Sequence, residues 1–258
     1  VITEHTGPFT TLTRTGYLRR MTQKALNAAD KVIAVSSALL SDIRQQIKLN
    51  AGVDTQVIAN LVDTDLFCEQ PAQQSEMIHL LWVGHFVPVK RVPVLLEAFA
   101  VAFQVEPRLR LRLAGSGEGL EQAQALVESL GITHVVEFSG RANRTQLVDY
   151  YRECDFLVIS SDSETFGVVA IEAMSCGRPV LTTRCGGPAE IVSHSQLGHV
   201  VGMGVEELTQ GILKMAGQRG AFNSKIIRKV TELKYSSFSI AKEIANVYSA
   251  LIDSRKFK

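Results

Sequence analysis

The stretch DFLVISSDSETFGVVAIEAMSCGRPVLTT, residues 155–183, contains in order the signals of a strand, a polar loop, a helix and a second strand. Its apolar run at 155–161 predicts a buried strand. The apolar segment that begins near Phe166 predicts a helix, which Gly177 ends because glycine readily adopts the left-handed conformation that follows many helices. The run at 179–183 predicts the next strand. A strand, a helix and a strand in this order form a right-handed unit with parallel strands.

The same alternation extends upstream over more than half of the chain. Strands are predicted at 79–84, 110–115 and 135–140, and helices at 92–103, 120–131 and 143–154. This pattern is typical of a doubly wound α/β domain with a parallel sheet, which we assign to residues 78–238. The two arginines of RLRLAG (110–115) indicate either an edge strand or a strand with one solvated face. Asn143 is placed to cap the helix that follows it.

The first 62 residues repeat the pattern in a less complete form. Strands are predicted at 1–5, 31–37 and 55–61, and helices at 15–30 and 37–47. We therefore interpret residues 1–62 as the C-terminal part of a second α/β domain. Residues 63–77 are polar and contain a proline, which favours a linker, and residues 239–258 favour a C-terminal helix that could pack back on the N-terminal part.

Composition excludes several classes of protein. The chain has 258 residues with a formal net charge of +1, so no overall field favours nucleic acid or membrane, although local basic patches stay open. No apolar run approaches the roughly 20 residues that a membrane span needs. The four cysteines are far apart in sequence and form no C-x-x-C pair, which favours reduced thiols over a zinc site and predicts a cytoplasmic protein.

Ligands of open parallel sheets bind beyond the carboxyl ends of the strands, where three loops qualify. In the loop at 161–167, Gly167 lacks a side chain, so an anion could approach the unpaired N–H groups that begin the next helix. Glu172 lies within that apolar helix, and a buried carboxylate needs hydrogen-bond donors. These donors are either an arginine or backbone groups of the core, or the hydroxyl groups of a ligand.

The other two loops differ in chemistry. The loop at 85–91 contains His85, Lys90 and Arg91, which either clamp a phosphate group or are simply solvated. The loop GSGEG at 115–119 resembles a dinucleotide-binding fingerprint, but its pattern is incomplete. We interpret it as a tight turn between a strand and a helix.

These segments together resemble the retaining glycosyltransferases of family 4, which have the GT-B fold of two facing Rossmann-like domains. Glu164-Thr165-Phe166-Gly167 with Glu172-Ala173-Met174 resembles the E-x7-E block of that family. The other matching segments follow the family's order and spacing, and they are Val83-Gly84 with Pro88-x-Lys90, Leu113-Ala114-Gly115-x-Gly117, Phe138-x-Gly140, Gly177-x-Pro179-Val180, Gly186-Gly187-x-x-Glu190-Ile191-Val192, and the two blocks at 29–36 and 57–63. The resemblance covers only the end of the acceptor domain, so we expect most of that domain to lie outside this chain.

The resemblance implies a role for each matching residue. Glu164 would contact hydroxyl groups of the donor sugar, and Glu172 would bind the ribose hydroxyls of the nucleotide. His5 matches an active-site histidine that the N-terminal domain contributes, so we assign the catalytic positions to Glu164 and His5. The remaining predicted donor-binding residues lie in three loops, and they are Gly84, His85, Lys90, Arg91, Arg141, Phe166, Gly167 and Val168.

The sequence also departs from the family. His85 stands where arginine is common, and histidine lacks both a permanent charge and the two-pronged donor of arginine. Arg91 replaces a small residue and could restore a cation, although from the other side of Lys90. Leu61 stands where glycine often follows asparagine. We expect these differences to affect affinity for the diphosphate most.

The implied reaction transfers a sugar, of hexose type, from a nucleoside diphosphate sugar to an acceptor with retention of anomeric configuration. No D-x-D pair stands beside the phosphate loop, so we expect no metal and no other cofactor, with a uridine diphosphate sugar as the favoured donor. Cations and amide dipoles would stabilise the charge on the departing diphosphate. Acceptors would be glycans or lipids.

The segment 14–31 favours a basic amphipathic helix, which either rests on an anionic membrane at the cytoplasmic face or is a solvated domain helix. A different class of function also stays open, because a chain without most of the acceptor domain could bind donor and transfer nothing. The other GT-B activities, an epimerase or a phosphorylase, fit less well. The E-x7-E block argues against the first, and the lack of an evident lysine anchor for pyridoxal phosphate argues against the second.

Overall fold

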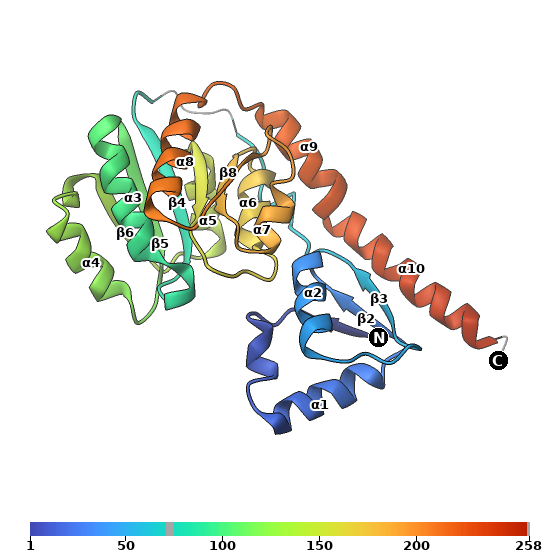
Figure 1. The fold of residues 1–258 in the computed structure, drawn as a ribbon. Coiled ribbons are helices and arrows are strands. Elements are labelled where there is room, and N and C mark those ends of the chain that lie inside the picture. The colour runs from blue at the N-terminus through green and yellow to red at the C-terminus, as the bar shows by residue number, and fades with distance from the viewer. Residues whose placement is uncertain (71–74, 257–258) are drawn as a thin grey trace.

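The computed structural model describes residues 1–70 and 75–256 and contains two parallel β-sheets (Figure 1). The larger sheet has six strands in the order β6-β5-β4-β7-β8-β9, and the smaller sheet has three in the order β1-β2-β3. Neighbouring strands of both sheets run parallel. The structure thus confirms the predicted α/β class with one large and one small parallel sheet.

The larger sheet follows the predicted alternation of strands and helices. Its strands are β4 (Ile78–His85), β5 (Leu109–Ser116), β6 (Val136–Gly140), β7 (Phe156–Ile159), β8 (Val180–Thr183) and β9 (Gly198–Val201). The helices of this part are η2 (Pro88–Lys90), α3 (Val92–Val105), α4 (Leu120–Ser129), η3 (Thr133–Val135), α5 (Arg144–Glu153), α6 (Val168–Ser175), α7 (Gly187–Ile191), α8 (Val205–Gly217) and α9 (Ser224–Tyr235). Asn143 caps α5 as predicted, because its side chain accepts the N–H of Gln146 at 2.9 Å.

Helices cover both faces of the larger sheet because successive side chains of a strand point to opposite faces. In β4, Leu80 and Trp82 are buried in a cluster with α3 and α8, whereas Leu81 is buried in a cluster with α5 and α6. Each face therefore has its own apolar layer, as a doubly wound sheet requires. This arrangement leaves the carboxyl ends of β4 and β7 side by side, with their loops on one edge of the sheet.

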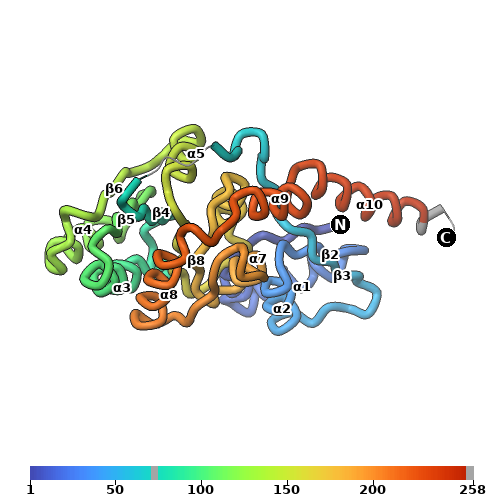
Figure 2. The backbone as a smooth tube through the Cα atoms, turned by 90° about the horizontal axis from the view of Figure 1, so that it is seen from above, coloured from blue at the N-terminus to red at the C-terminus, as the bar shows by residue number. Residues whose placement is uncertain are grey.

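The smaller sheet consists of β1 (Ile2–Glu4), β2 (Lys31–Ala34) and β3 (Asp54–Val57), with η1 (Phe9–Leu12), α1 (Gly16–Asn27) and α2 (Ser37–Gln46). The last helix, α10 (Ser237–Lys256), leaves α9 and runs along this sheet (Figures 1 and 2). Ile240 and Val247 of α10 are buried together with Ile33 and Ile58, so the end of the chain packs on its beginning.

The structure settles two details of the larger sheet that the sequence left open. Strand β5 lies between β4 and β6, so the arginines of RLRLAG mark a solvated face and not an edge. Helix α6 begins at Val168, two residues after Phe166, because Gly167 before it has the left-handed φ of 87°. The elements α7, β9, α8 and α9 had not been assigned from the sequence.

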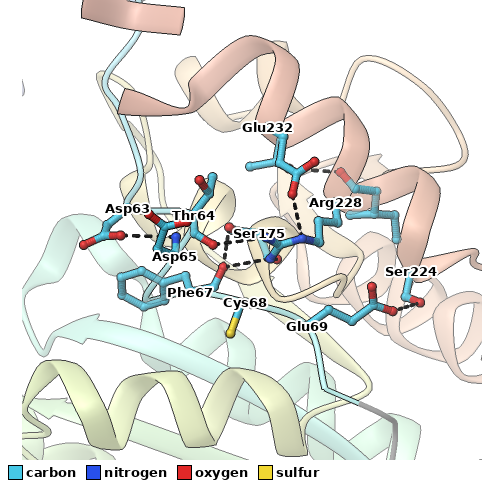
Figure 3. Close-up of polar contacts among 12 residues, drawn as sticks. Asp63, Thr64, Asp65, Phe67, Cys68, Glu69, Ser175, Ser224, Arg228 and Glu232 are labelled. Carbon is cyan, nitrogen blue, oxygen red and sulfur yellow. Dashed lines mark hydrogen bonds and ion pairs between the residues drawn. The ribbon is translucent and has the colours of Figure 1, made fainter. Parts of the chain in front are cut away.

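The described part of the predicted linker is held by specific hydrogen bonds (Figure 3). Arg228 of α9 donates to the carbonyl oxygens of Thr64, Phe67 and Ser175 at distances of 3.1, 3.3 and 2.9 Å. Glu232 pairs with the same guanidinium at 2.8 Å. Residues 71–74 of the predicted linker lie outside the described residues.

The chain passes between the two sheets twice, and the two crossings touch. The N–H of Val62 donates to the carbonyl of Tyr235 at 2.8 Å, and Val62 also forms a parallel bridge with Ser236. Arg228 then fixes the segment that follows Val62 to α9. Residues 62–67 and the junction of α9 with α10 are therefore joined by hydrogen bonds.

Candidate active site

The loops after β4 and β7 are joined by hydrogen bonds at the carboxyl edge of the larger sheet. The N–H of Asp162 donates to the carbonyl of Val89 at 2.8 Å, and the Ser160 hydroxyl donates to the carbonyl of Lys90 at 2.7 Å. Both bonds fix the short helix η2, which carries Lys90 at its end. The loop at 85–91 and the loop at 161–167 therefore form one surface, as their positions in the sequence predicted.

Lys90 and Glu164 form an ion pair on this surface. Their side chains are 22% and 16% exposed, so both charges are largely withdrawn from water while remaining accessible. The Ser161 hydroxyl donates to Oε1 of Glu164 at 3.0 Å and fixes the orientation of the carboxylate. The structure thus brings together the cation predicted to hold the diphosphate and the carboxylate predicted to contact the donor sugar.

Gly167 connects this surface to the start of α6. Besides its left-handed φ, a Cβ added at this position would lie 2.6 Å from Cγ of Pro188, so any other residue would be strained and crowded. Phe166 is buried, with its ring edge-on to Tyr235 at 6.0 Å between centroids, whereas Val168 is exposed. Helix α6 begins four residues after Glu164, and its first two N–H groups, of Val168 and Val169, have no partners within the helix.

Glu172 lies within α6 and accepts a hydrogen bond from the Tyr151 hydroxyl at 2.9 Å. Tyr151 comes from α5 and is fully buried. Burial raises the pKa of the Glu172 carboxyl, although the hydrogen bond from Tyr151 and the charge of Arg144 both act to lower it. Tyr151 is thus one of the hydrogen-bond donors that the buried carboxylate of Glu172 needs, and the sequence does not predict it. The binding of ribose hydroxyls by Glu172 stays a prediction.

His5 follows β1 and is exposed. Its carbonyl accepts a hydrogen bond from Oγ1 of Thr165 at 3.3 Å, which places the end of the smaller sheet against the predicted sugar-binding loop. A Cβ added at Gly7 would lie 2.7 Å from Cγ2 of Thr165, so the two segments approach closely. The structure therefore brings His5 to the same surface as Glu164, and its catalytic role stays a prediction.

Three other predicted donor-binding residues are placed less closely together. His85 ends β4 in register with Ser116 and is exposed. Arg91 donates to the carbonyl of Met203 at 2.7 Å and pairs with Asp162 at 3.1 Å, so its guanidinium has partners other than the one that Lys90 has. Arg141 is exposed directly after Gly140, the last residue of β6, and its backbone borders the same edge.

The GSGEG loop is a tight turn, as expected. A Cβ at Gly115 would overlap the carbonyl oxygen of Gly84 at 1.8 Å, and one at Gly117 would lie 2.6 Å from the N atom of Phe86. The N–H of Gly119 also donates to the carbonyl of Phe86 at 2.9 Å. These glycines allow the GSGEG loop to pack directly against the backbone of Gly84 and Phe86.

A hollow of about 1010 Å³ lies at the opposite edge of the sheet, where β4, β5 and β6 begin. It is lined by several charged residues, but most of them already pair with one another. Arg112 contacts Glu137 at 3.0 Å and Glu153 at 2.5 Å, and Arg219 contacts Asp155 at 2.6 Å. None of the predicted site residues is among the described residues that line this hollow.

Tyr151 and Ser161 were not foreseen, although both hold predicted carboxylates. Tyr151 lies on the apolar face of a predicted helix, and a buried tyrosine hydroxyl usually needs a polar partner, which is the signal that could have found it. Within residues 1–70 and 75–256, no group of three or more histidine, cysteine, aspartate or glutamate side chains is arranged to hold a metal ion. The helices described also include none that could span a membrane.

Comparison of the sequence with known protein families agrees with the fold and with the loops at the carboxyl edge. The sequence model of the glycosyl transferases group 1 matches residues 64–230, which cover most of the chain. The chain therefore belongs to the glycosyl transferases group 1 family, with a GT-B type of α/β fold. This confirms the family and the fold class that the motifs predicted.

Relatives with a curated description are similar over most of the chain. The chain is 31% identical over 251 residues to D-inositol 3-phosphate glycosyltransferase 2 of Catenulispora acidiphila, covering 89% of this chain and 58% of that protein. It is 30% identical over 213 residues to N-acetyl-alpha-D-glucosaminyl L-malate synthase of Bacillus anthracis, covering 79% and 54%. The chain thus spans little more than half the length of these relatives.

Solved structures share the fold. Anabaena HepE, solved in complex with UDP-glucose, is 25% identical with a TM-score of 0.78, and the match covers 92% of this chain and 69% of HepE. A sucrose-phosphate synthase from Thermosynechococcus elongatus is 23% identical with a TM-score of 0.82, covering 98% and 67%. The second likeness supports the fold alone.

Proposed function

We propose that this chain contributes the donor-binding side of a glycosyltransferase that moves a sugar from a nucleoside diphosphate sugar to a glycan or lipid acceptor. The transfer retains the anomeric configuration and needs no metal ion. Family membership and the UDP-glucose complex of HepE support the class of donor, and among donors they favour a uridine diphosphate sugar. A hexosyl group is the sugar that we expect.

The observation that carries this proposal is the Lys90–Glu164 ion pair, whose carboxylate precedes the start of α6 by four residues. A nucleoside diphosphate sugar has an anionic diphosphate next to a neutral ring that carries hydroxyl groups. The ammonium of Lys90 and the first N–H groups of α6 suit the diphosphate, and the Glu164 carboxylate suits the hydroxyls. Donor binding would open the ion pair and give each charge a partner on the ligand.

In the proposed reaction, the acceptor hydroxyl oxygen bonds to the anomeric carbon as the bond from that carbon to the β-phosphate oxygen breaks. Attack from the same face retains the configuration, and the proton of the acceptor passes to the departing phosphate oxygen. Lys90 and the N–H groups of residues 166–168 stabilise the growing negative charge. Because these groups already supply positive potential, the transfer is proposed to proceed without a metal ion.

The remaining predicted residues complete the donor site in this proposal. Glu172 binds the ribose hydroxyls from within α6, and the backbone at Arg141 contacts the base. His5 orients groups near the sugar from the smaller sheet, which its contact with Thr165 supports. His85 borders the diphosphate, and Arg91 acts by positioning the loop after Lys90, since its guanidinium is held by Met203 and Asp162.

We further propose that residues 1–62 belong to the acceptor side, 63–77 to the linker, 78–238 to the donor side and 239–258 to a helix that returns to the acceptor side. Helix α1 exposes Tyr17 and Met21, and it lies within the basic segment 14–31. Contact of this segment with an anionic membrane at the cytoplasmic face is a proposal, tested by co-sedimentation with phosphatidylglycerol vesicles. Absence of binding at low salt would contradict it.

Calorimetry with UDP, together with UDP release from UDP-glucose, tests the proposal. Binding with release would support a transferase, because water can replace the acceptor slowly. Binding without release would support the alternative, a nucleotide-sugar-binding module without transfer. Absence of binding to uridine, guanosine and adenosine diphosphates, in protein that melts cooperatively, would contradict both functions.

A further inference from the structure

The four N–H groups that begin α2 are all hydrogen-bonded, but only two of the acceptors belong to its own segment. The Ser36 hydroxyl accepts from Leu39 at 3.0 Å, and the Ser36 carbonyl accepts from Leu40 at 3.1 Å. The first two N–H groups, of Ser37 and Ala38, donate to the carboxylate of Glu190 at 2.9 and 2.6 Å. The larger sheet therefore supplies half of the cap of a helix that belongs to the smaller sheet.

Glu190 lies in α7, whose start is fixed to the sugar-binding loop. The N–H of Gly187 donates to the carbonyl of Glu164 at 2.9 Å, and the N–H of Glu164 donates to the carbonyl of Cys185 at 2.7 Å. A Cβ at Gly186 would lie 2.7 Å from the Glu164 oxygen, and one at Gly187 would lie 2.4 Å from Cα of Phe166. Helix α7 and the loop that carries Glu164 are therefore joined by backbone hydrogen bonds and close packing.

A second set of contacts joins the same loop to the smaller sheet. The Ser36 hydroxyl donates to the carbonyl of Thr165, and Oγ1 of Thr165 donates to the carbonyl of His5. Thr165 is thus held between the start of α2 and the end of β1. The Glu190 bonds anchor α2 at the position where these contacts form.

We propose that Glu190 is a positioning residue that holds α2, and through it His5, against the loop that carries Glu164. This role rests on the proposed function and assigns to Glu190 a task distinct from contact with the donor. A carboxylate at a helix N-terminus accepts hydrogen bonds from the N–H groups that have no partner within the helix, and it interacts favourably with the helix dipole. Glu190 and Ser37 are both exposed, so water reaches these bonds and hydrogen exchange can follow them.

Amide hydrogen exchange tests the contact without requiring any activity. In Glu190→Ala, we expect the amides of Ser37 and Ala38 to exchange about tenfold faster, because they lose their acceptors, while Ile43 within α2 stays protected. Glu190→Gln keeps a carbonyl oxygen, so exchange should be intermediate. Glu206→Ala removes an exposed acid from the first turn of α8 and serves as the matched control. Unchanged exchange in Glu190→Ala would overturn the contact.

Kinetics with UDP-glucose and water test the role in transfer. We expect Glu190→Ala to keep the Kd for UDP within about twofold, since the donor loops lie on the larger sheet, and to lower kcat about tenfold with KM nearly unchanged. Glu190→Gln should restore part of kcat. A wild-type kcat in Glu190→Ala would refute the positioning role. Failure of the wild-type chain to bind UDP would instead refute the proposed function, and the exchange experiment would still decide the contact.

Discussion

The six-stranded sheet has charged groups both where β4, β5 and β6 begin, which we call the amino edge, and at the carboxyl ends of β4 and β7, the carboxyl edge. The charged groups at these two places have different partners. At the amino edge, Arg112 lies between two carboxylates, and it also stacks on the ring of Tyr150 at 4.6 Å. At the carboxyl edge, Lys90 has Glu164 as its carboxylate partner, and four residues after Glu164 helix α6 begins with unpaired N–H groups. Ion pairs are present at both edges, so opposite charges alone do not identify a ligand-binding site. The carboxyl edge differs because it also has N–H donors without partners, which could donate hydrogen bonds to a ligand.

The strongest test of this difference is the removal of one carboxylate from the proposed donor site and one from the amino edge. Glu172→Ala should lower the release of UDP from UDP-glucose about 100-fold, because a charged hydrogen bond to the ligand is lost and Tyr151 keeps an unsatisfied hydroxyl. Glu153→Ala, which leaves Arg112 paired with Glu137, should change the rate less than about twofold. Equal rates for Glu172→Ala and the wild type would remove Glu172 from the donor site.

The cations of the two edges provide the second test. Lys90→Ala should raise the Kd for UDP about 30-fold, since a charge-assisted contact to phosphate contributes about 2 kcal/mol. Arg112→Ala, at the amino edge, should leave that Kd unchanged. Isothermal calorimetry measures both, and the slope of affinity against salt should decrease only for Lys90→Ala. A similar loss of affinity in both variants would show that the effect comes from the overall charge.

The third test concerns the close packing of the carboxyl edge. Gly167→Ala should lower the free energy of unfolding by about 2 kcal/mol, because alanine is disfavoured at a φ of 87° and its Cβ would crowd Pro188. Gly140→Ala is the matched control, since Gly140 has a φ of 67° but no atom within 4 Å of an added Cβ. It should cost only about 1 kcal/mol. Denaturant titration measures the free energy of unfolding of both variants. An equal loss in the two would mean that Pro188 shifts to accommodate the added Cβ without further loss of stability.

The smallest expected effect is the dependence of stability on pH. Burial raises the pKa of Glu172 above its ordinary value of 4.5, so the folded state binds this proton more tightly than the unfolded state. Stability from this group is then present below pH 4.5 and is lost as the pH rises through the raised pKa. Glu172→Gln should therefore be as stable as the wild type at pH 4 and more stable at pH 7. A melting-temperature difference that shrinks between pH 4 and 7 would contradict this sign.

The sequence predicted the elements of the larger sheet up to β8 because apolar runs and glycines report directly on strands and turns. It also identified the loops that meet at the carboxyl edge, since parallel topology fixes which strand ends are neighbours. It could not assign the partner of Glu172, because the register of α5 against α6 depends on packing between distant segments. For the same reason the acceptor of the Ser37 and Ala38 N–H groups, 152 or more residues away, left no local signal. The arginines of β5 were ambiguous because a solvated face and an edge give the same pattern.

The hydrogen bond between Val62 and Tyr235 has a mechanical consequence. The two segments that connect the sheets are bonded to each other at Val62 and Tyr235. Any rotation of one sheet relative to the other would therefore occur about an axis through these residues. Points near the axis move little, and points far from it move most. Tyr235 also contacts Phe166, so the loop that carries Glu164 lies close to the axis and should keep its shape during rotation.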